Sequence, residues 1–173
     1  MRASVSSLSS QTEQASRAGA RIRPARPADL DALVLLLCDL FSIEEDFEVD
    51  AVRQRRGLAA MLANVGCCVL VAEADGRVVG MCTGQLIIST AEGGPALLVE
   101  DVIVEKKWRG RGIGSRLLEE LADWGRTRKA CRLQLLADRS NGPALLFYQK
   151  LGWQSTGLIC LRKRQQGAAF TMR

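Results

Sequence analysis

Apolar positions in the first third of the chain predict one strand followed by two helices. A strand is expected at residues 22–26, and Pro27 suits the first turn of the helix that follows, where apolar residues recur at helical spacing up to Phe41. Asp50 can cap a second helix, whose apolar residues from Val52 to Val65 are expected to face inward. The region is therefore expected to place one amphipathic helix pair against a sheet.

The next apolar runs predict three antiparallel strands joined by tight turns. Residues 67–73 and 78–89 flank Asp75-Gly76, a pair that favours a two-residue hairpin. A second turn at residues 92–95 returns the chain into a β-branched run at residues 99–104. Connections this short imply antiparallel pairing.

The last third of the chain alternates helices and strands. Apolar residues from Ile113 to Trp124 repeat at helical spacing, and a strand is expected at residues 132–137. Because a helical crossover precedes this strand, it is expected to lie parallel to the strand at residues 99–104. A further helix begins at Asn141, and residues 153–161 are expected to supply the last strand or strands.

The turn between the 99–104 strand and the following helix contains three glycines and two arginines. Gly110, Gly112 and Gly114 permit positive φ, so consecutive backbone N–H groups can converge on an anion at the positive end of the helix. Arg109 and Arg111 add charge-assisted donors at the same place. The turn is thus a candidate phosphate site, with packing of the helix on the strand as the alternative explanation.

Two known phosphate motifs do not fit this turn. A dinucleotide fingerprint needs a third glycine where the chain has Ser115, and a P-loop needs a closing Gly-Lys-Ser or Gly-Lys-Thr, which the turn lacks. The pattern that remains is Arg-x-x-Gly-x-Gly from Arg109 to Gly114.

This pattern and a second one, Asn-Gly-Pro-Ala-Leu-Leu-Phe-Tyr-Gln-Lys-Leu-Gly-Trp at residues 141–153, resemble the Gcn5-related N-acetyltransferase (GNAT) family. The resemblance covers residues 22 to about 163 and implies an α/β fold. Its sheet is expected to be mixed and mostly antiparallel, with six or seven strands and about four flanking helices. We expect one domain at residues 21–164, a mobile N-terminal tail at residues 1–20 and a frayed end at residues 165–173.

The resemblance also implies acetyl-coenzyme A (acetyl-CoA) as the cofactor. The backbone of residues 102–104 is expected to pair with the pantetheine arm, and a β-bulge there would free an N–H group to polarise the thioester carbonyl. Asn141 would contact the cofactor, or it serves only as a helix N-cap. The candidate cofactor-binding residues are Val102, Ile103, Val104, Arg109, Gly110, Arg111, Gly112, Ile113, Gly114, Ser115 and Asn141.

Two side chains are candidates for proton transfer. Tyr148 is the only tyrosine of the chain and lies where the family keeps its general acid, although a packed core tyrosine is the alternative. The pKa of a phenol, about 10, is close to that of a thiol, about 8.5, so a tyrosine can transfer a proton to a departing thiolate. Glu100 or Asp101 can accept the proton of an amine, and we favour Glu100 because the Glu-Asp pair resembles the polyamine acetyltransferase branch. Since neighbouring strand residues point to opposite faces, at most one of these carboxylates is expected to point into a pocket.

Composition narrows the chemistry. The chain of 173 residues has no histidine, which excludes Ser-His-Asp and Cys-His catalysis and histidine-containing metal sites, so no metal is expected. The net charge of +5 comes from scattered basic residues without interleaved aromatics, so nucleic acid is not the expected partner. No apolar run approaches the roughly 20 residues of a membrane span. The six cysteines form no C-x-x-C pair and predict free thiols in a reducing cytoplasm.

The sequence leaves the acceptor open. The acidic run at residues 44–48, together with Glu100, can attract a cationic amine, but a solvated charge run explains the same residues. The resemblance implies that the helix pair before residue 65 borders the acceptor pocket. The expected function is acetyl transfer to a primary amine, either of a small molecule or of a peptide, and the alternative is a silent acetyl-CoA-binding regulatory module. Many relatives dimerise, so a homodimer is also open.

Overall fold

A computed structural model of the chain describes residues 19–42 and 48–163. The chain divides into two compact units, Met1–Leu135 and Leu136–Arg173, and each is described by itself. The end expected at residues 165–173, most of the expected N-terminal tail and most of the acidic run lie outside the described residues.

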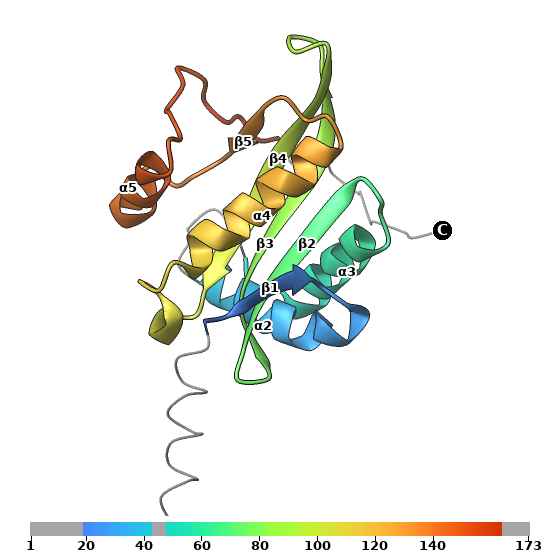
Figure 1. Cartoon of the computed structure of the whole chain (residues 1–173), viewed down its shortest axis with the longest axis vertical. Helices are drawn as coiled ribbons and strands as arrows, with labels where there is room; N and C mark the ends of the chain where they lie inside the picture. Colours follow the sequence, from blue (N-terminus) through green and yellow to red (C-terminus); the bar gives the residue numbers. More distant parts are fainter. Residues whose placement is uncertain (1–18, 43–47, 164–173) are drawn as a thin grey trace, which may run out of the picture. The chain divides into compact units, whose positions relative to one another are not determined.

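The first unit is built on a five-stranded sheet in the order β1-β2-β3-β4-β5 (Figure 1). The antiparallel pairing of β2, β3 and β4 follows the prediction from their short connections, and β5 pairs parallel with β4 as its helical crossover predicted. β1 pairs antiparallel with β2. The strands are β1 (Arg21–Pro24), β2 (Cys67–Ala74), β3 (Arg77–Ser89), β4 (Gly94–Val104) and β5 (Leu133–Leu135).

The helices lie close to their predicted positions. Asp50 caps α3, as predicted, by accepting a hydrogen bond from the Arg53 backbone N–H at 3.0 Å. The helical elements are η1 (Pro27–Asp29), α2 (Leu30–Phe41), α3 (Ala51–Leu62), η2 (Lys106–Trp108), α4 (Ile113–Thr127) and, in the second unit, α5 (Gly142–Lys150).

The two faces of the sheet carry different helices, α2 and α3 on one and α4 on the other (Figure 1). Leucines of α2 and α3 pack on Val71, Met81 and Ile103, whereas Leu117 and Leu121 of α4 are buried against the opposite face. Two glycines bring α4 very close to the strands. A Cβ at Gly84 would lie 3.0 Å from a Leu121 methyl, and a Cβ at Gly125 would lie 2.9 Å from a Leu97 methyl. Because protein interiors are densely packed, this contact fixes the position of α4 along the sheet.

The prediction of six or seven strands is wrong, because the described residues contain five. The missing element is the strand expected at residues 153–161, a segment that forms no ladder in the structure. Its apolar residues Leu158, Ile159 and Leu161 are largely exposed. An apolar run becomes a strand only where another strand pairs with its backbone, and no such partner is present for this segment in the described part of the chain.

Two inward-facing assignments in the second helix are also wrong. Val52 is 77% exposed and Val65 is 92% exposed. Val52 lies in the first turn of α3, and Val65 lies beyond its end, so neither is on the stripe that packs on the sheet.

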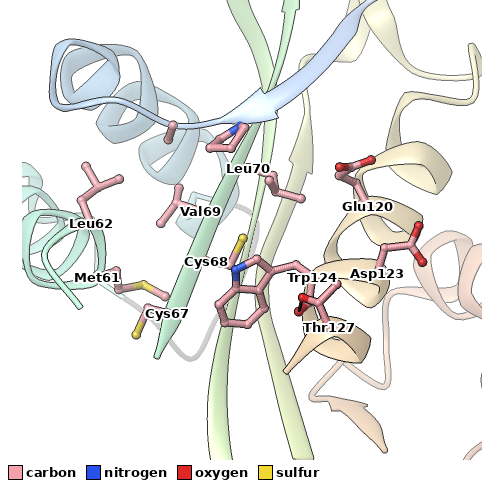
Figure 2. Close-up of a pocket in the computed structure, with 12 residues that line it drawn as sticks. Met61, Leu62, Cys67, Cys68, Val69, Leu70, Glu120, Asp123, Trp124 and Thr127 are labelled. Carbon is pink, nitrogen blue, oxygen red and sulfur yellow. Dashed lines mark hydrogen bonds between the residues drawn. The ribbon is translucent and has the colours of Figure 1, made fainter. Parts of the chain in front are cut away.

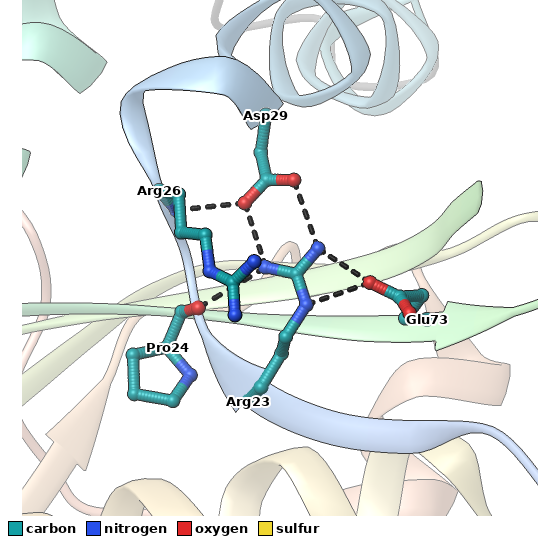
Figure 3. A network of polar contacts seen from close by, with 5 residues as sticks. All are labelled: Arg23, Pro24, Arg26, Asp29 and Glu73. Carbon is teal, nitrogen blue, oxygen red and sulfur yellow. Dashed lines mark hydrogen bonds and ion pairs between the residues drawn. The ribbon is translucent and has the colours of Figure 1, made fainter. Parts of the chain in front are cut away.

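Arg23 of β1 joins the first strand to the start of α2 (Figure 3). Its guanidinium bonds both carboxylate oxygens of Asp29, at 2.7 and 2.9 Å, and its Nε donates to Glu73 of β2 at 2.7 Å. The Arg26 backbone N–H also donates to Asp29, at 2.7 Å. These bonds to the charged form hold the pKa of Asp29 below its ordinary value, with the Arg23 bond as the largest cause.

We expect Asp29→Asn to lower the free energy of unfolding by about 2 kcal/mol at pH 7, the usual worth of a charge-assisted bond between mostly buried groups. Because the folded-state pKa is depressed, this stability exists above the unfolded pKa and is lost as the pH falls through the folded value. Urea unfolding of parent and variant at pH 7 and pH 3 measures the deficit, which should shrink at pH 3. Asp31→Asn is the control, since the Asp31 side chain is 84% exposed in its pair with Arg55. Equal deficits at both pH values would contradict the prediction.

Candidate active site

The glycine-rich turn before α4 has the geometry of an anion nest. Gly110 and Gly112 adopt φ values of 73° and 75°, and Gly112 is the N-cap of α4. The first bond of the helix runs from the Arg116 N–H to the Gly112 carbonyl at 3.1 Å. The N–H groups of residues 113–115 therefore have no acceptor within the helix. A Cβ at Gly110 or Gly112 would meet no atom within 4 Å, so the backbone is open to approach there.

The two arginines of the turn are each held in place. Arg109 Nε donates to the Val104 carbonyl at 2.8 Å, and the Arg111 guanidinium lies over the Trp108 ring, 4.7 Å from its centroid. Both arginines are exposed, and the side chain of Ile113 is buried in the core. Ile113 can thus offer only its backbone N–H to a ligand, whereas the arginines can offer charge.

A β-bulge interrupts the pairing of β4 with β3. Met81 pairs with Ile103 and Thr83 pairs with Glu100, so two residues of β4, Asp101 and Val102, oppose one residue of β3. Asp101 has a φ of 26°, which lies in the left-handed region. The bulge that the family resemblance implied is therefore present in β4.

The bulge lies beside an open stretch of strand edge. β5 pairs only with residues 97–99 of β4, and no other strand in the described residues pairs with β4 on that side. On the opposite side the Glu105 N–H donates to the Val79 carbonyl at 2.9 Å. Since hydrogen bonding alternates along an antiparallel ladder, Ile103 turns toward β3, and Val102 and Val104 turn toward the open edge. The edge ends at Val104, whose carbonyl bonds Arg109 at the start of the nest.

Glu100 and Asp101 point to the same face of the sheet. Gln85 Nε2 donates to Glu100 at 2.7 Å, and Thr83 Oγ1 donates to Asp101 at 2.9 Å. Thr83 and Gln85 are two residues apart on β3, and Met81 on the same face belongs to the core under α2 and α3. The alternation of neighbouring side chains, on which the choice between the two carboxylates was based, therefore does not hold at this point, because the bulge interrupts it.

The two carboxylates differ in environment. Glu100 is exposed, whereas burial raises the pKa of Asp101 to about 6. The Thr83 hydroxyl opposes this rise by bonding the charged form, and the negative charge of Glu100 adds to it. Sequence reasoning did not single out Thr83, although a polar residue inside an apolar strand was a usable signal.

The second unit contains the other predicted site residues. Asn141 Oδ1 accepts the Ala144 backbone N–H at 3.1 Å, so Asn141 is the N-cap of α5. Tyr148 is half-buried in α5, and its ring lies 5.3 Å from that of Phe147 and 6.0 Å from that of Trp153. Aromatic neighbours on two sides restrict the orientation of the phenol.

A groove of about 440 Å³ lies elsewhere in the first unit, at the start of β2 (Figure 2). It lies between the end of α3, with Met61 and Leu62, and the C-terminal half of α4, with Trp124. None of the predicted site residues lines it. The described residues contain no group of three potential metal-binding side chains, and no helix among them has the length and hydropathy needed to cross a membrane.

Comparison with known sequences identifies the family. The profile described as acetyltransferase (GNAT) family matches residues 31–153. N-alpha-acetyltransferase 80 of Mus musculus is 42% identical over 78 residues, which are 45% of this chain and 22% of the mouse protein. Glucosamine 6-phosphate N-acetyltransferase of Trypanosoma brucei brucei is 30% identical over 109 residues, 62% of this chain and 69% of that protein. The chain thus spans less than a quarter of the mouse relative.

A solved structure supports the fold. The crystal structure of a possible acetyltransferase from Clostridium difficile 630 aligns with a TM-score of 0.74 and 21% identity, covering 85% of this chain and 98% of that one. The match of the family profile confirms the resemblance that the two motifs indicated, and the enzyme class of this family is acetyl-CoA-dependent acetyltransferase. A profile that matches residues 31–153 covers more than half of the sequence, and the chain therefore belongs to the acetyltransferase (GNAT) family.

Proposed function

We propose that this protein is an N-acetyltransferase that moves an acetyl group from acetyl-CoA to a primary amine. The observation that carries the proposal is the open edge of β4, which runs past a bulge and ends at the glycine nest. The mouse and trypanosome relatives are both named as N-acetyltransferases, which supports an amine nitrogen as the acceptor. Free cysteines at all six positions support a cytoplasmic location.

The residues present fit acetyl-CoA. The exposed nest offers backbone N–H groups and two guanidinium groups to a pyrophosphate, which fits the positive end of α4. The outward backbone groups of Val102 and Val104 can bond an extended amide-containing arm as a neighbouring strand would. Asn141, besides its role as N-cap, is the residue that the family resemblance assigns to a polar contact with the cofactor. When bound, acetyl-CoA supplies an activated acetyl thioester.

The chain supplies three groups to the transfer. The Val102 N–H, turned toward the open edge, stabilises negative charge on a carbonyl oxygen. Glu100 takes up the proton that the amine loses, directly or through a water molecule, and its position on the α2 and α3 face gives it access to an acceptor from that side. Tyr148 gives its Oη proton to the departing sulfur. The amine attacks directly while both substrates are bound.

The test is calorimetric titration with acetyl-CoA, followed in the same sample by thiol release against polyamines, amino acids and peptide amines. We expect micromolar binding of acetyl-CoA and thiol release with one class of amine. A panel of alcohols, which lack the amine, serves as the control. Binding without turnover on any amine would favour the silent regulatory module. Absence of binding would contradict the assignment of the nest.

A further inference from the structure

A second feature of the bulge is the hydrogen bond between Asp101 and Thr83. Thr83 is fully buried, and its Oγ1 donates to Asp101 Oδ2 at 2.9 Å. Resting on the proposed function, we propose that this bond is a latch that holds the β4 bulge, so that Asp101 and Thr83 are positioning residues for the Val102 N–H. The latch acts on the backbone and does not touch the acceptor or the thioester.

The backbone at the bulge needs such support. Asp101 has a φ of 26°, in a region that is unfavourable for residues other than glycine. Aspartate is among the residues that tolerate it, because its short side chain can bond nearby backbone groups. Thr83 bonds the Asp101 carboxylate from the neighbouring strand at 2.9 Å. The bond to Thr83 therefore offsets part of the local backbone strain.

Packing alone does not explain why residue 83 is a threonine. A buried hydroxyl without a partner costs free energy, and valine has nearly the same shape. The same holds for the carboxylate, since burial disfavours its charged form. The buried hydroxyl and the half-buried carboxylate therefore each need the other. Their bond links β3 to β4 where the register of that pair shifts.

Loss of the bulge would change which backbone group faces the open edge. A shift of one residue in a strand exchanges the groups on its two sides and turns the side chains to the opposite face. Without the bulge, Ile103 in place of Val102 would present its N–H to the open edge, and the carboxylates would no longer share a face. Loss of the latch is therefore expected to misplace the Val102 N–H that bonds the carbonyl oxygen, and to affect cofactor binding at the nest less.

The test uses paired substitutions at both ends of the latch. Thr83→Val removes the hydroxyl and Thr83→Ser retains it, while Asp101→Gly tolerates the positive φ and Asp101→Ala does not. We expect Thr83→Val to lower kcat by about 10- to 100-fold, somewhat less than complete loss of an oxyanion donor, and to leave the Kd for acetyl-CoA within about twofold. Thr83→Ser should keep the parental kcat, and Asp101→Gly should keep more activity than Asp101→Ala. Ser89→Ala, the loss of another buried hydroxyl of β3, is the control and should change neither value.

Hydrogen exchange of the β4 amides gives a reading that does not depend on turnover. Exchange at residues 101–103 should be faster in Thr83→Val and unchanged in Thr83→Ser and Ser89→Ala. Parental kcat and exchange in Thr83→Val would overturn the latch. Equal losses in Asp101→Gly and Asp101→Ala would overturn it too, because the carboxylate would then act directly. Should the parent chain turn over no amine, the proposed function fails, and the exchange measurement alone decides whether the latch holds the bulge.

Discussion

Tyr148→Phe is expected to lower kcat by about 10²- to 10⁴-fold, the usual contribution of a positioned general acid. The substitution removes one hydroxyl and keeps the ring that packs beside Phe147 and Trp153. Since the proposed cofactor-binding residues do not include Tyr148, the Kd for acetyl-CoA should stay at the parental value. Steady-state thiol release and calorimetric titration on the same preparation measure the two quantities separately.

A second variant distinguishes loss of the general acid from loss of structure around Tyr148. Tyr148→Leu is the companion variant, because it removes the hydroxyl and the ring contacts together. If the hydroxyl carries the effect, both variants lose the same factor in kcat, and Tyr148→Leu loses more thermal stability than Tyr148→Phe because it also loses the ring contacts. A Tyr148→Phe enzyme as fast as the parent would remove Tyr148 from the mechanism and leave protonation of the sulfur to solvent.

Gly112→Val is expected to weaken acetyl-CoA binding by about 10- to 100-fold, the equivalent of one or two charge-assisted hydrogen bonds. A φ of 75° is strongly unfavourable for a β-branched residue, so the turn must change conformation and its N–H groups must diverge. The new side chain would also project into the space above the nest, where a Cβ now meets no atom within 4 Å. Calorimetric titration measures the change in Kd.

Gly93→Val is the matched control for the nest variant. Gly93 lies in the turn between β3 and β4, has a φ of 67°, and also has open space at its Cβ position. Both variants should lose a similar amount of stability, and only Gly112→Val should lose affinity. Equal affinities in the two variants would show that the Gly110–Ser115 turn does not hold the pyrophosphate.

Elements with local signals were predictable from the sequence. Asp75-Gly76 predicted its hairpin and Asp50 predicted the start of α3. The glycine turn predicted the left-handed residues Gly110 and Gly112, whereas Gly114 lies inside α4 and has no positive φ. Each of these depends on the conformational preferences of one or two residues and on their immediate neighbours. The parallel pairing of β5 followed from its helical crossover, a rule of chain connection that also needs no side-chain detail.

Features that depend on contacts distant in sequence were not predictable. The pairing of Thr83 with Asp101 joins residues 18 positions apart, and the register shift that turns both carboxylates to one face exists only once β3 and β4 pair. The expected strand at residues 153–161 failed for the related reason that a strand requires a partner, which its own sequence does not supply. The groove beside Trp124 likewise arises from the spacing of α3 and α4 and has no local sequence signature.

The close packing of α4 on the strands at Gly84 and Gly125 also affects the amino end of the helix. Because α4 packs closely on the strands, a larger residue at Gly125 would press on a Leu97 methyl, and either that side chain or the helix must shift. The amino end of α4 carries the nest, about four helical turns from Gly125, so a shift of the helix would also move the amides that we propose bind phosphate. A screen for variants with weakened cofactor affinity would therefore also find substitutions in the core, far from the nest. These substitutions would lie at positions along α4.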